Sequence, residues 1–195
     1  MDYAADAQHT AMGLLSLERW KAWNARWSID LYHEDGFLVM SRGAMQPGGF
    51  EHDSFHYLSG LGHALRRTDA AMLREKHPVW NADRYVEGYL NPIGGWVESG
   101  RVIAMLAKEA REARIEVIEH VKAPRPVLAS GRCNGIESSD GGVWTADLVL
   151  VASGAWTPEV LPHLQNVMWT TAQTVFHFLP SQPERFRAPA FPVWG

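Results

Sequence analysis

Three small residues, Ser153-Gly154-Ala155, stand between an apolar run and the start of a helix. The apolar residues 148–152 predict a strand that is buried on both faces. Thr157 suits the N-cap of the following helix and Pro158 suits its first position. A strand, a small-residue turn and a helix N-terminus together bring the backbone close to a ligand in α/β domains. An ordinary connection that binds nothing has the same pattern, so these residues alone leave both interpretations open.

Other residue types that could do chemistry lack the spacing that chemistry needs. His52 and His56 are four residues apart and would share one helix face, but a polar surface face explains them better than a zinc site. Ser153 lacks the preceding glycine of a nucleophile elbow. The lone Cys133 falls in a turn and is interpreted as an incidental thiol. The sequence contains neither a Walker lysine motif nor a G-x-G-x-x-G motif in the correct context. We therefore expect no metal site and no catalytic residue in this chain.

Composition narrows the class of protein. The 195 residues are enough for one large domain or one and a half, with a formal net charge of −4. Both signs of charge are spread along the chain, which does not favour a nucleic-acid partner. No apolar run approaches the roughly 18 residues that cross a bilayer. The acidic N-terminal residues and the single cysteine indicate no secretory signal and no internal disulfide. We expect an intracellular, soluble protein, cytoplasmic or peroxisomal, with no membrane partner; its oligomeric state is left open.

The elements that would position the 153–155 turn begin with a long N-terminal helix. Apolar residues recur at spacings of three and four over residues 6–27 and again over 99–114. The Asp-Gly pair at 35–36 predicts a hairpin between strands at 29–32 and 36–40. The remaining elements expected in the first half are helices over 50–61 and from the Thr68-Asp69 cap to Pro78, and strands at 65–67 and 84–89.

The second half of the chain predicts mainly strands. Residues 115–119 would form a strand directly after the 99–114 helix. A three-stranded meander is expected at 127–129, 135–137 and 143–145, because turns containing glycine separate the three segments. It leads into the 148–152 strand. Residues 167–179 alternate over a long span and predict an antiparallel strand of a different sheet.

The order of these elements resembles one family. The pattern begins with the turn Asn91-Pro92-Ile93-Gly94-Gly95-Trp96. The helix after it, the strand around Val117 and the meander follow in that order. The pattern ends with residues 152–156, then residues 172–179, and finally Phe191-Pro192-Val193-Trp194. Together they resemble the FAD-dependent amine oxidases of the D-amino-acid-oxidase superfamily, in the branch of monomeric sarcosine oxidase, pipecolate oxidase and fructosyl amino acid oxidase. The resemblance extends from Tyr3 through Trp194, although each motif alone is weak.

This resemblance implies an α/β fold, α+β overall. It would consist of part of a Rossmann-like FAD-binding domain with a β-meander and part of an antiparallel-sheet substrate domain. The FAD-binding part would comprise residues 1–30 and 95–165, and the substrate part residues 31–94 and 166–195. The implied activity is oxidation of the C–N bond of a secondary amine or N-substituted amino acid, with O2 as acceptor and H2O2 as product.

The resemblance also implies which residues contact FAD. They are the backbone near Ala123, after the strand around Val117, and the turn formed by Ala152, Ser153 and Gly154 with Trp156. The family's glycine fingerprint and its later substrate-domain strands do not match any residues here, so the chain looks like an internal fragment. Asn91, Trp96 and Trp194 could approach a substrate cavity or simply pack.

Three functional hypotheses remain open at this point. The first is an FAD-dependent amine oxidase acting on a small-molecule amine or amino acid. The second is a truncated, catalytically inactive fragment of such a flavoprotein. The third is a non-catalytic α/β binding module. Flavin absorbance together with peroxide release would separate the first from the other two.

Overall fold

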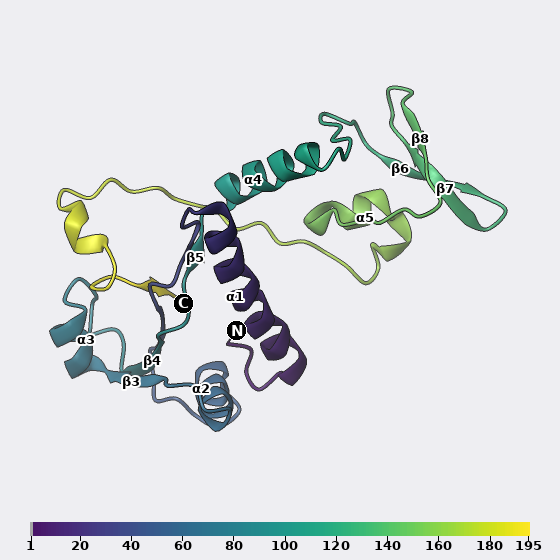
Figure 1. Ribbon diagram of the computed structural model, residues 1–195. Coiled ribbons are helices and arrows are strands. Elements are labelled where there is room, and N and C mark those ends of the chain that lie inside the picture. The colour runs from purple at the N-terminus through teal and green to yellow at the C-terminus, as the bar shows by residue number, and fades with distance from the viewer. Residues whose placement is uncertain (1) are drawn as a thin grey trace. The chain divides into compact units, whose positions relative to one another are not determined.

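The computed structural model describes residues 2–195 and divides the chain into two compact units (Figure 1). Unit 1 consists of Met1–Lys108 and Leu179–Gly195, and unit 2 of Glu109–Phe178. Residues within each unit contact one another more than they contact the other unit. The assignment of residues 1–30 and 95–165 to a cofactor domain and of 31–94 and 166–195 to a substrate domain stays a prediction.

The helices expected from sequence periodicity are present. They are α1 (Ala7–Trp27), α2 (Phe50–Gly60), α3 (Ala70–Lys76) and α4 (Ser99–Glu112), with the short α5 (Thr157–Val160) in unit 2. Local capping fixes where two of them begin. The Asp6 carboxylate accepts from the backbone N–H of His9 at 2.9 Å, and Asp69 accepts from that of Met72 at 2.8 Å.

Unit 1 is built on a four-stranded sheet in the order β3-β4-β2-β9. Its strands are β2 (Phe37–Ser41), β3 (Arg66–Asp69), β4 (Glu87–Asn91) and β9 (Val193–Trp194). The pairs β2–β4 and β3–β4 are antiparallel, whereas β9 pairs in parallel with β2. A separate two-stranded pairing joins β1 (Tyr32–His33) to β5 (Trp96–Val97).

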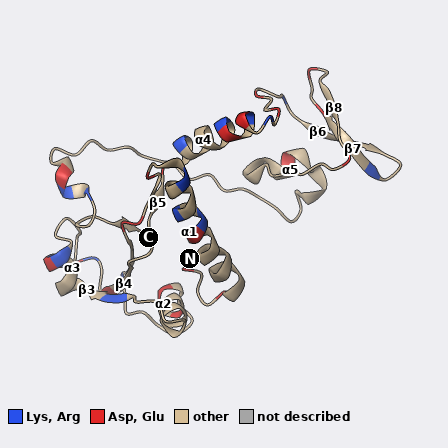
Figure 2. Ribbon diagram, in the orientation of Figure 1, with Lys and Arg blue, Asp and Glu red and all other residues tan. Residues whose placement is uncertain are grey.

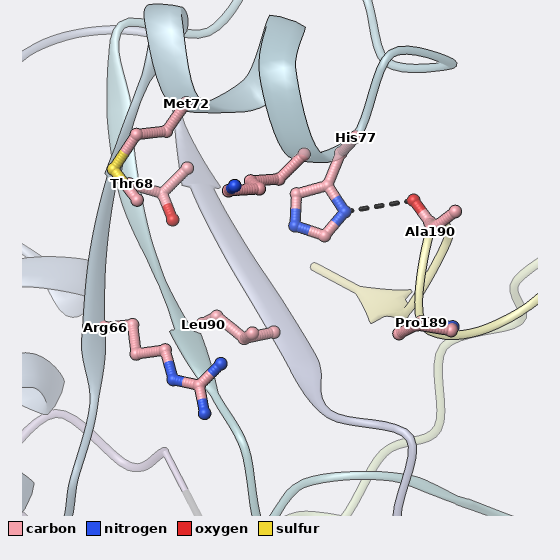
Figure 3. A pocket seen from close by; sticks show the side chains of 8 residues that line it. Arg66, Thr68, Met72, His77, Leu90, Pro189 and Ala190 are labelled. Atoms are coloured by element: carbon pink, nitrogen blue, oxygen red, sulfur yellow. Dashed lines mark hydrogen bonds between the residues drawn. The ribbon is translucent and has the colours of Figure 1, made fainter.

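The sheet of unit 1 buries different residues on its two faces, because successive side chains of a strand point to opposite sides. Leu38 and Met40 pack with Leu73 of α3 on one face. Figure 3 shows Met72 of α3 beside Thr68 of β3. On the other face, Val39 and Tyr89 form a second cluster, against which Phe55 of α2 packs. Helices α2 and α3 therefore cover opposite faces of one sheet.

The predicted hairpin between residues 29–32 and 36–40 is wrong. Tyr32 pairs with Val97, and Phe37 pairs with Asn91, so the two segments join different sheets. The Asp-Gly turn is still there, with Gly36 in the left-handed region at φ 86°. A local turn signal cannot determine which distant strand each arm pairs with, and here each arm finds a partner of its own.

Unit 2 contains the predicted meander. Its strands are β6 (Arg125–Ala129), β7 (Arg132–Glu137) and β8 (Val143–Thr145), paired antiparallel in that order. Gly135 has φ 156°, and a Cβ there would lie 2.1 Å from the carbonyl oxygen of Trp144, so only glycine fits that crossing.

Three strands predicted from apolar runs are not formed in the described residues. Residues 115–119, 148–152 and 167–179 belong to no strand, and residues 167 and 168 lie in a turn whose backbone N–H groups donate to the Leu164 carbonyl. Leu148 and Leu150 are each 85% exposed, so the expected burial of residues 148–152 on both faces is also wrong. A strand requires a hydrogen-bonding neighbour, and no described residue of the chain supplies one to these segments.

Lys and Arg, and likewise Asp and Glu, are scattered over both units (Figure 2). Within the described residues, no helix is both long and apolar enough to span a membrane.

Candidate functional site

The 152–156 turn forms a short 3₁₀ turn that runs directly into α5. Gly154–Trp156 is the 3₁₀ segment, and the backbone N–H of Trp156 donates to the Ser153 carbonyl at 3.0 Å. The Ser153 and Thr157 hydroxyls lie 3.1 Å apart. Gly154 has φ 53°, a left-handed conformation that a side chain would strain. The glycine therefore allows the chain to change direction between the apolar run and the helix.

The expected cap of this helix is displaced by one residue. Trp156 occupies the N-cap, Thr157 is the first helical residue and Pro158 the second. Trp156, the last residue of the 3₁₀ turn, already has right-handed helical backbone angles, and α5 begins without a side-chain cap. The prediction of Thr157 as N-cap and Pro158 at the first position was wrong by that one residue.

Ala123 lies in a second turn of unit 2. It has φ 42° and is exposed. The carbonyl of the preceding Lys122 accepts from the Ser139 backbone N–H at 3.0 Å and from the Ser139 hydroxyl at 3.3 Å. This contact ties the Ala123 turn to the meander. Among the described residues, no hydrogen bond joins Ala123 to the 152–156 turn, so the two proposed cofactor contacts are held independently.

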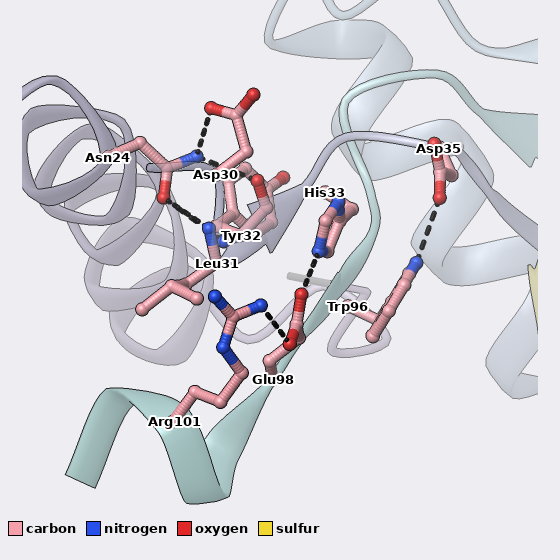
Figure 4. A network of polar contacts seen from close by, with 9 residues as sticks. All are labelled: Asn24, Asp30, Leu31, Tyr32, His33, Asp35, Trp96, Glu98 and Arg101. Atoms are coloured by element: carbon pink, nitrogen blue, oxygen red, sulfur yellow. Dashed lines mark hydrogen bonds and ion pairs between the residues drawn. The ribbon is translucent and has the colours of Figure 1, made fainter. Parts of the chain in front are cut away.

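In unit 1, a polar network surrounds the residue that follows the Gly94-Gly95 pair (Figure 4). The indole Nε1 of Trp96 donates to the Asp35 carboxylate at 2.8 Å, and the ring stacks on His33 with 4.2 Å between centroids. Gly95 makes this approach possible, because a Cβ there would lie 1.9 Å from the carbonyl oxygen of His33. The Asp35 hydrogen bond thus fixes the edge of the Trp96 ring, and the His33 ring covers one of its faces.

The His33 ring connects this network to the start of α4. Its Nε2 lies 2.9 Å from Glu98 Oε1, and Arg101 Nη1 donates to Glu98 Oε2 at 2.7 Å (Figure 4). Hydrogen bonds from Arg101 and then His33 hold the pKa of the Glu98 carboxyl below its usual range. This carboxylate therefore stays ionised and keeps the His33 ring oriented against Trp96.

Trp96 and Trp194 line one cavity of about 610 Å³, so the structure brings two of the three candidate substrate residues together. Asp35 and Arg187 line the same cavity. The third candidate, Asn91, is elsewhere: it is 1% exposed, and its Nδ2 donates to the Asp2 carboxylate at 3.3 Å. Asn91 is therefore a buried structural residue.

Sequence reasoning missed the charged residues of this cavity. Asp35 was assigned only to a turn, and Arg187 fell in a proline-rich segment without a motif. The signal that could have drawn attention to Arg187 is the aromatic pair around it: Phe186 and Phe191 also line the cavity, with ring centroids 5.2 Å apart.

The remaining candidates give no sign of chemistry. The rings of His52 and His56 are 4.2 Å apart, and His52 Nδ1 lies 2.9 Å from the Asp53 carboxylate. In the part of the chain that is described, no group of three His, Cys, Asp or Glu side chains could hold a metal ion. Cys133 is a half-buried free thiol whose Sγ lies 3.5 Å from the Gly135 carbonyl oxygen.

Comparison with known proteins places the chain in a family. Residues 1–194 match the family described as "FAD dependent oxidoreductase". The amino acid oxidase imqH of Aspergillus flavus is 27% identical over 191 residues, which cover 80% of this chain and 40% of that protein.

Solved structures share the fold. NikD, described as an unusual amino acid oxidase essential for nikkomycin biosynthesis, matches with a TM-score of 0.67 at 21% identity, over 84% of this chain and 42% of that chain. A thermally stable mutant of fructosyl peptide oxidase matches with a TM-score of 0.62 at 20% identity, over 81% of this chain and 39% of its own.

This chain spans only about 40% of the length of the curated relative it matches. The match to the family nevertheless extends over nearly every residue. It confirms the resemblance inferred from the order of the elements, and it confirms the flavin as the cofactor. The chain therefore belongs to the FAD dependent oxidoreductase family, whose cofactor is FAD.

Proposed function

We propose that this protein takes part in FAD-dependent oxidation of the C–N bond of an amino acid or secondary amine. FAD, when bound, would supply a two-electron oxidant: the carbon beside the nitrogen gives up its hydrogen with two electrons and the nitrogen gives up a proton, which leaves an imine, and O2 would take up two electrons and two protons to give H2O2. The similarity to an amino acid oxidase supports an amino-acid substrate. The observation that carries the proposal is the Trp96–Trp194 cavity, which combines aromatic walls with one basic and one acidic side chain.

The 152–156 turn is compatible with a cofactor lying against its backbone. Nothing lies within 4 Å of the position that a Cβ would take on Gly154. Ala152 and Gly154 are exposed, and the Trp156 side chain is 72% exposed. Residues 152–154 thus offer open backbone and only small side chains, which leaves room for a planar or phosphate-bearing group. We assign the FAD contacts to Ala152, Ser153, Gly154 and Trp156, with Ala123 as a second contact.

The cavity in unit 1 fits the chemistry of an amino-acid substrate. A carboxylate suits the guanidinium of Arg187, which makes no ion pair among the described residues. The faces of Trp96 and Trp194 can contact an apolar or cationic body. The hydrogen bond from Trp96 to Asp35 and the stacking on His33 keep that indole in one orientation, which limits the entropy lost on binding.

Purified protein tests this proposal directly. The 195-residue chain is titrated with FAD while flavin fluorescence is followed, and peroxide release is then measured with sarcosine, pipecolate, fructosyl-glycine, glycine and proline. We expect the flavin to be retained and peroxide to form with one of these amines. Arg187→Gln should raise KM by about tenfold or more, because a charged hydrogen bond is lost.

Arg185→Gln is the matched control, since Arg185 contacts Gln182 at 3.2 Å and is not among the residues that line the cavity. It should leave KM unchanged. A folded, colourless chain that neither binds FAD nor releases peroxide would contradict the proposal and would favour an inactive fragment. Flavin retention without turnover of any amine would favour a binding module.

A further inference from the structure

A second cavity lies on the face of the unit 1 sheet that α3 covers, and its charge is unusual for this chain (Figure 3). Its volume is about 400 Å³, within the range of small-molecule sites. Three basic residues line it, Arg66, Lys76 and His77, and no carboxylate is among the lining residues. The whole chain has a formal net charge of −4, so this is a local excess of positive charge.

Arg66 is the cation best placed to bind a ligand. It lies on β3, the edge strand, on the same face as Thr68, and in Figure 3 its side chain extends along the cavity below Leu90. The described residues provide no hydrogen bond or ion pair to its guanidinium. The neighbouring Arg67 points to the other face and donates to the Glu87 carboxylate at 2.5 Å. The two adjacent arginines thus differ: Arg67 has an acidic partner in the protein, whereas Arg66 lines the cavity.

His77 adds a buried polar group that points into this space. The residue is only 8% exposed. Its Nδ1 donates to the Ala190 carbonyl at 3.0 Å, because a carbonyl oxygen can only accept, and this bond orients the ring. The opposite ring edge, with Nε2, faces the cavity (Figure 3). Among the described residues, Nδ1 is the only ring nitrogen of His77 that has a hydrogen-bond partner.

The rest of the lining is apolar. Met72, Leu90, Pro189 and Ala190 supply the walls, and Thr68 places a hydroxyl among them. Lys76 also lines the cavity while pairing with its neighbour Glu75. An anion without an apolar body would leave these walls in water, and an uncharged apolar molecule would leave Arg66 unpaired. The complementary ligand has both parts.

We propose that this cavity binds a small monocarboxylate with an aromatic or aliphatic body. The carboxylate pairs with Arg66 and lies beside the Nε2 edge of the His77 ring. The apolar body lies against Met72, Leu90 and Pro189. The inference does not depend on the proposed oxidase activity, since it uses neither the flavin turn nor the Trp96–Trp194 cavity.

Calorimetric titration of the full chain with 3-phenylpropionate tests the proposal, with the uncharged 3-phenylpropionamide as the matched ligand. We expect the carboxylate to bind at least about tenfold more tightly than the amide, since a charged hydrogen bond is at stake. Arg66→Gln should weaken carboxylate binding by a similar factor, Lys76→Gln should weaken it less, and Arg66→Lys should retain part of it. Far-UV circular dichroism of each variant shows whether it has folded.

Arg74→Gln is the control within α3, because Arg74 pairs with Asp83 and is not among the residues that line the cavity. It should bind the probe as the unchanged chain does. Equal affinity for acid and amide would overturn the proposal, and so would the absence of binding at millimolar probe. Binding that survives Arg66→Gln and is lost in Trp96→Ala would place the probe in the other cavity, which would also overturn it.

Discussion

Asn24 in α1 binds both backbone groups of Tyr32, the first residue of β1. Its Nδ2 donates to the Tyr32 carbonyl at 2.8 Å, and its Oδ1 accepts from the Tyr32 N–H at 3.1 Å (Figure 4). Oδ1 also accepts from the Leu31 N–H at 3.0 Å. The Asn24 amide therefore makes the backbone hydrogen bonds that a neighbouring strand would otherwise make. These bonds fix the position of β1 relative to α1.

Replacing this amide should destabilise unit 1. Asn24→Ala removes the partner of the Leu31 N–H and of both backbone groups of Tyr32, two buried residues, and we expect a loss of about 1–3 kcal/mol in the free energy of unfolding. Urea denaturation followed by tryptophan fluorescence measures it. Gln8→Ala, which removes an exposed amide from the same helix, should change stability little; equal losses in the two variants would contradict the role of Asn24.

Stability at acid pH should depend on Glu98. Its pKa is lowered by Arg101 and His33, so it contributes stability that is present above the ordinary carboxyl pKa near 4.5 and is lost as the pH falls through the lowered value. Glu98→Gln should therefore flatten the decrease in stability below pH 4.5, and Arg101→Gln should flatten it in part. Urea midpoints at several pH values between 3 and 6 check this. An unchanged slope in Glu98→Gln would refute it.

At alkaline pH, Tyr32 should be the residue to follow. Burial, and then the charges of Glu34 and Asp35, raise its pKa to about 12, and its hydroxyl donates to the Ile93 carbonyl at 3.0 Å. Because the folded pKa exceeds the ordinary value of 10.0, this contribution to stability is complete below pH 10 and is lost between pH 10 and about 12. Tyr32→Phe should lessen the fall in stability over that range. Tyrosinate absorbance should show one fewer late-titrating group than in the unchanged chain.

Two leucines that fall in predicted strands, Leu38 and Leu150, should differ sharply in their effect on stability. Leu38 of β2 is fully buried and packs with Leu73 of α3, and Leu38→Ala should cost about 2–5 kcal/mol. Leu150 is 85% exposed, and Leu150→Ala should change stability by no more than about 0.5 kcal/mol. Thermal and urea unfolding of the two variants compares them. A large loss in Leu150→Ala would mean that residues 148–152 are covered after all.

Features with a local cause could be predicted from the sequence. Asp6 and Asp69 cap their helices through residues three positions ahead, so the starts of α1 and α3 follow from the nearest residues alone. The meander followed from closely spaced glycine turns. The family could also be inferred, because the order of such elements is itself a pattern and the match to residues 1–194 bears it out.

Features that depend on distant partners could not be predicted. Nothing near Phe37 indicates that it pairs with Asn91 on one side and Val193 on the other. The same limit applies to the cavity, where Trp96 and Arg187 meet through the fold and not through any sequence spacing. Apolar runs such as residues 148–152 show a tendency to form strands, but that tendency is realised only when a neighbouring strand accepts their hydrogen bonds.

The parallel pairing of β9 with β2 has a consequence during synthesis. β2 is hydrogen-bonded on one side by β4 within the first hundred residues, but its other edge receives Val193, Trp194 and Gly195. At about 5–20 residues per second, a ribosome needs roughly 8–30 s to make the residues in between. The nascent chain therefore emerges with one edge of its central strand open, and all of unit 2 appears before that edge is closed. During that interval the open edge of β2 is available for binding by a chaperone that shields exposed strand edges.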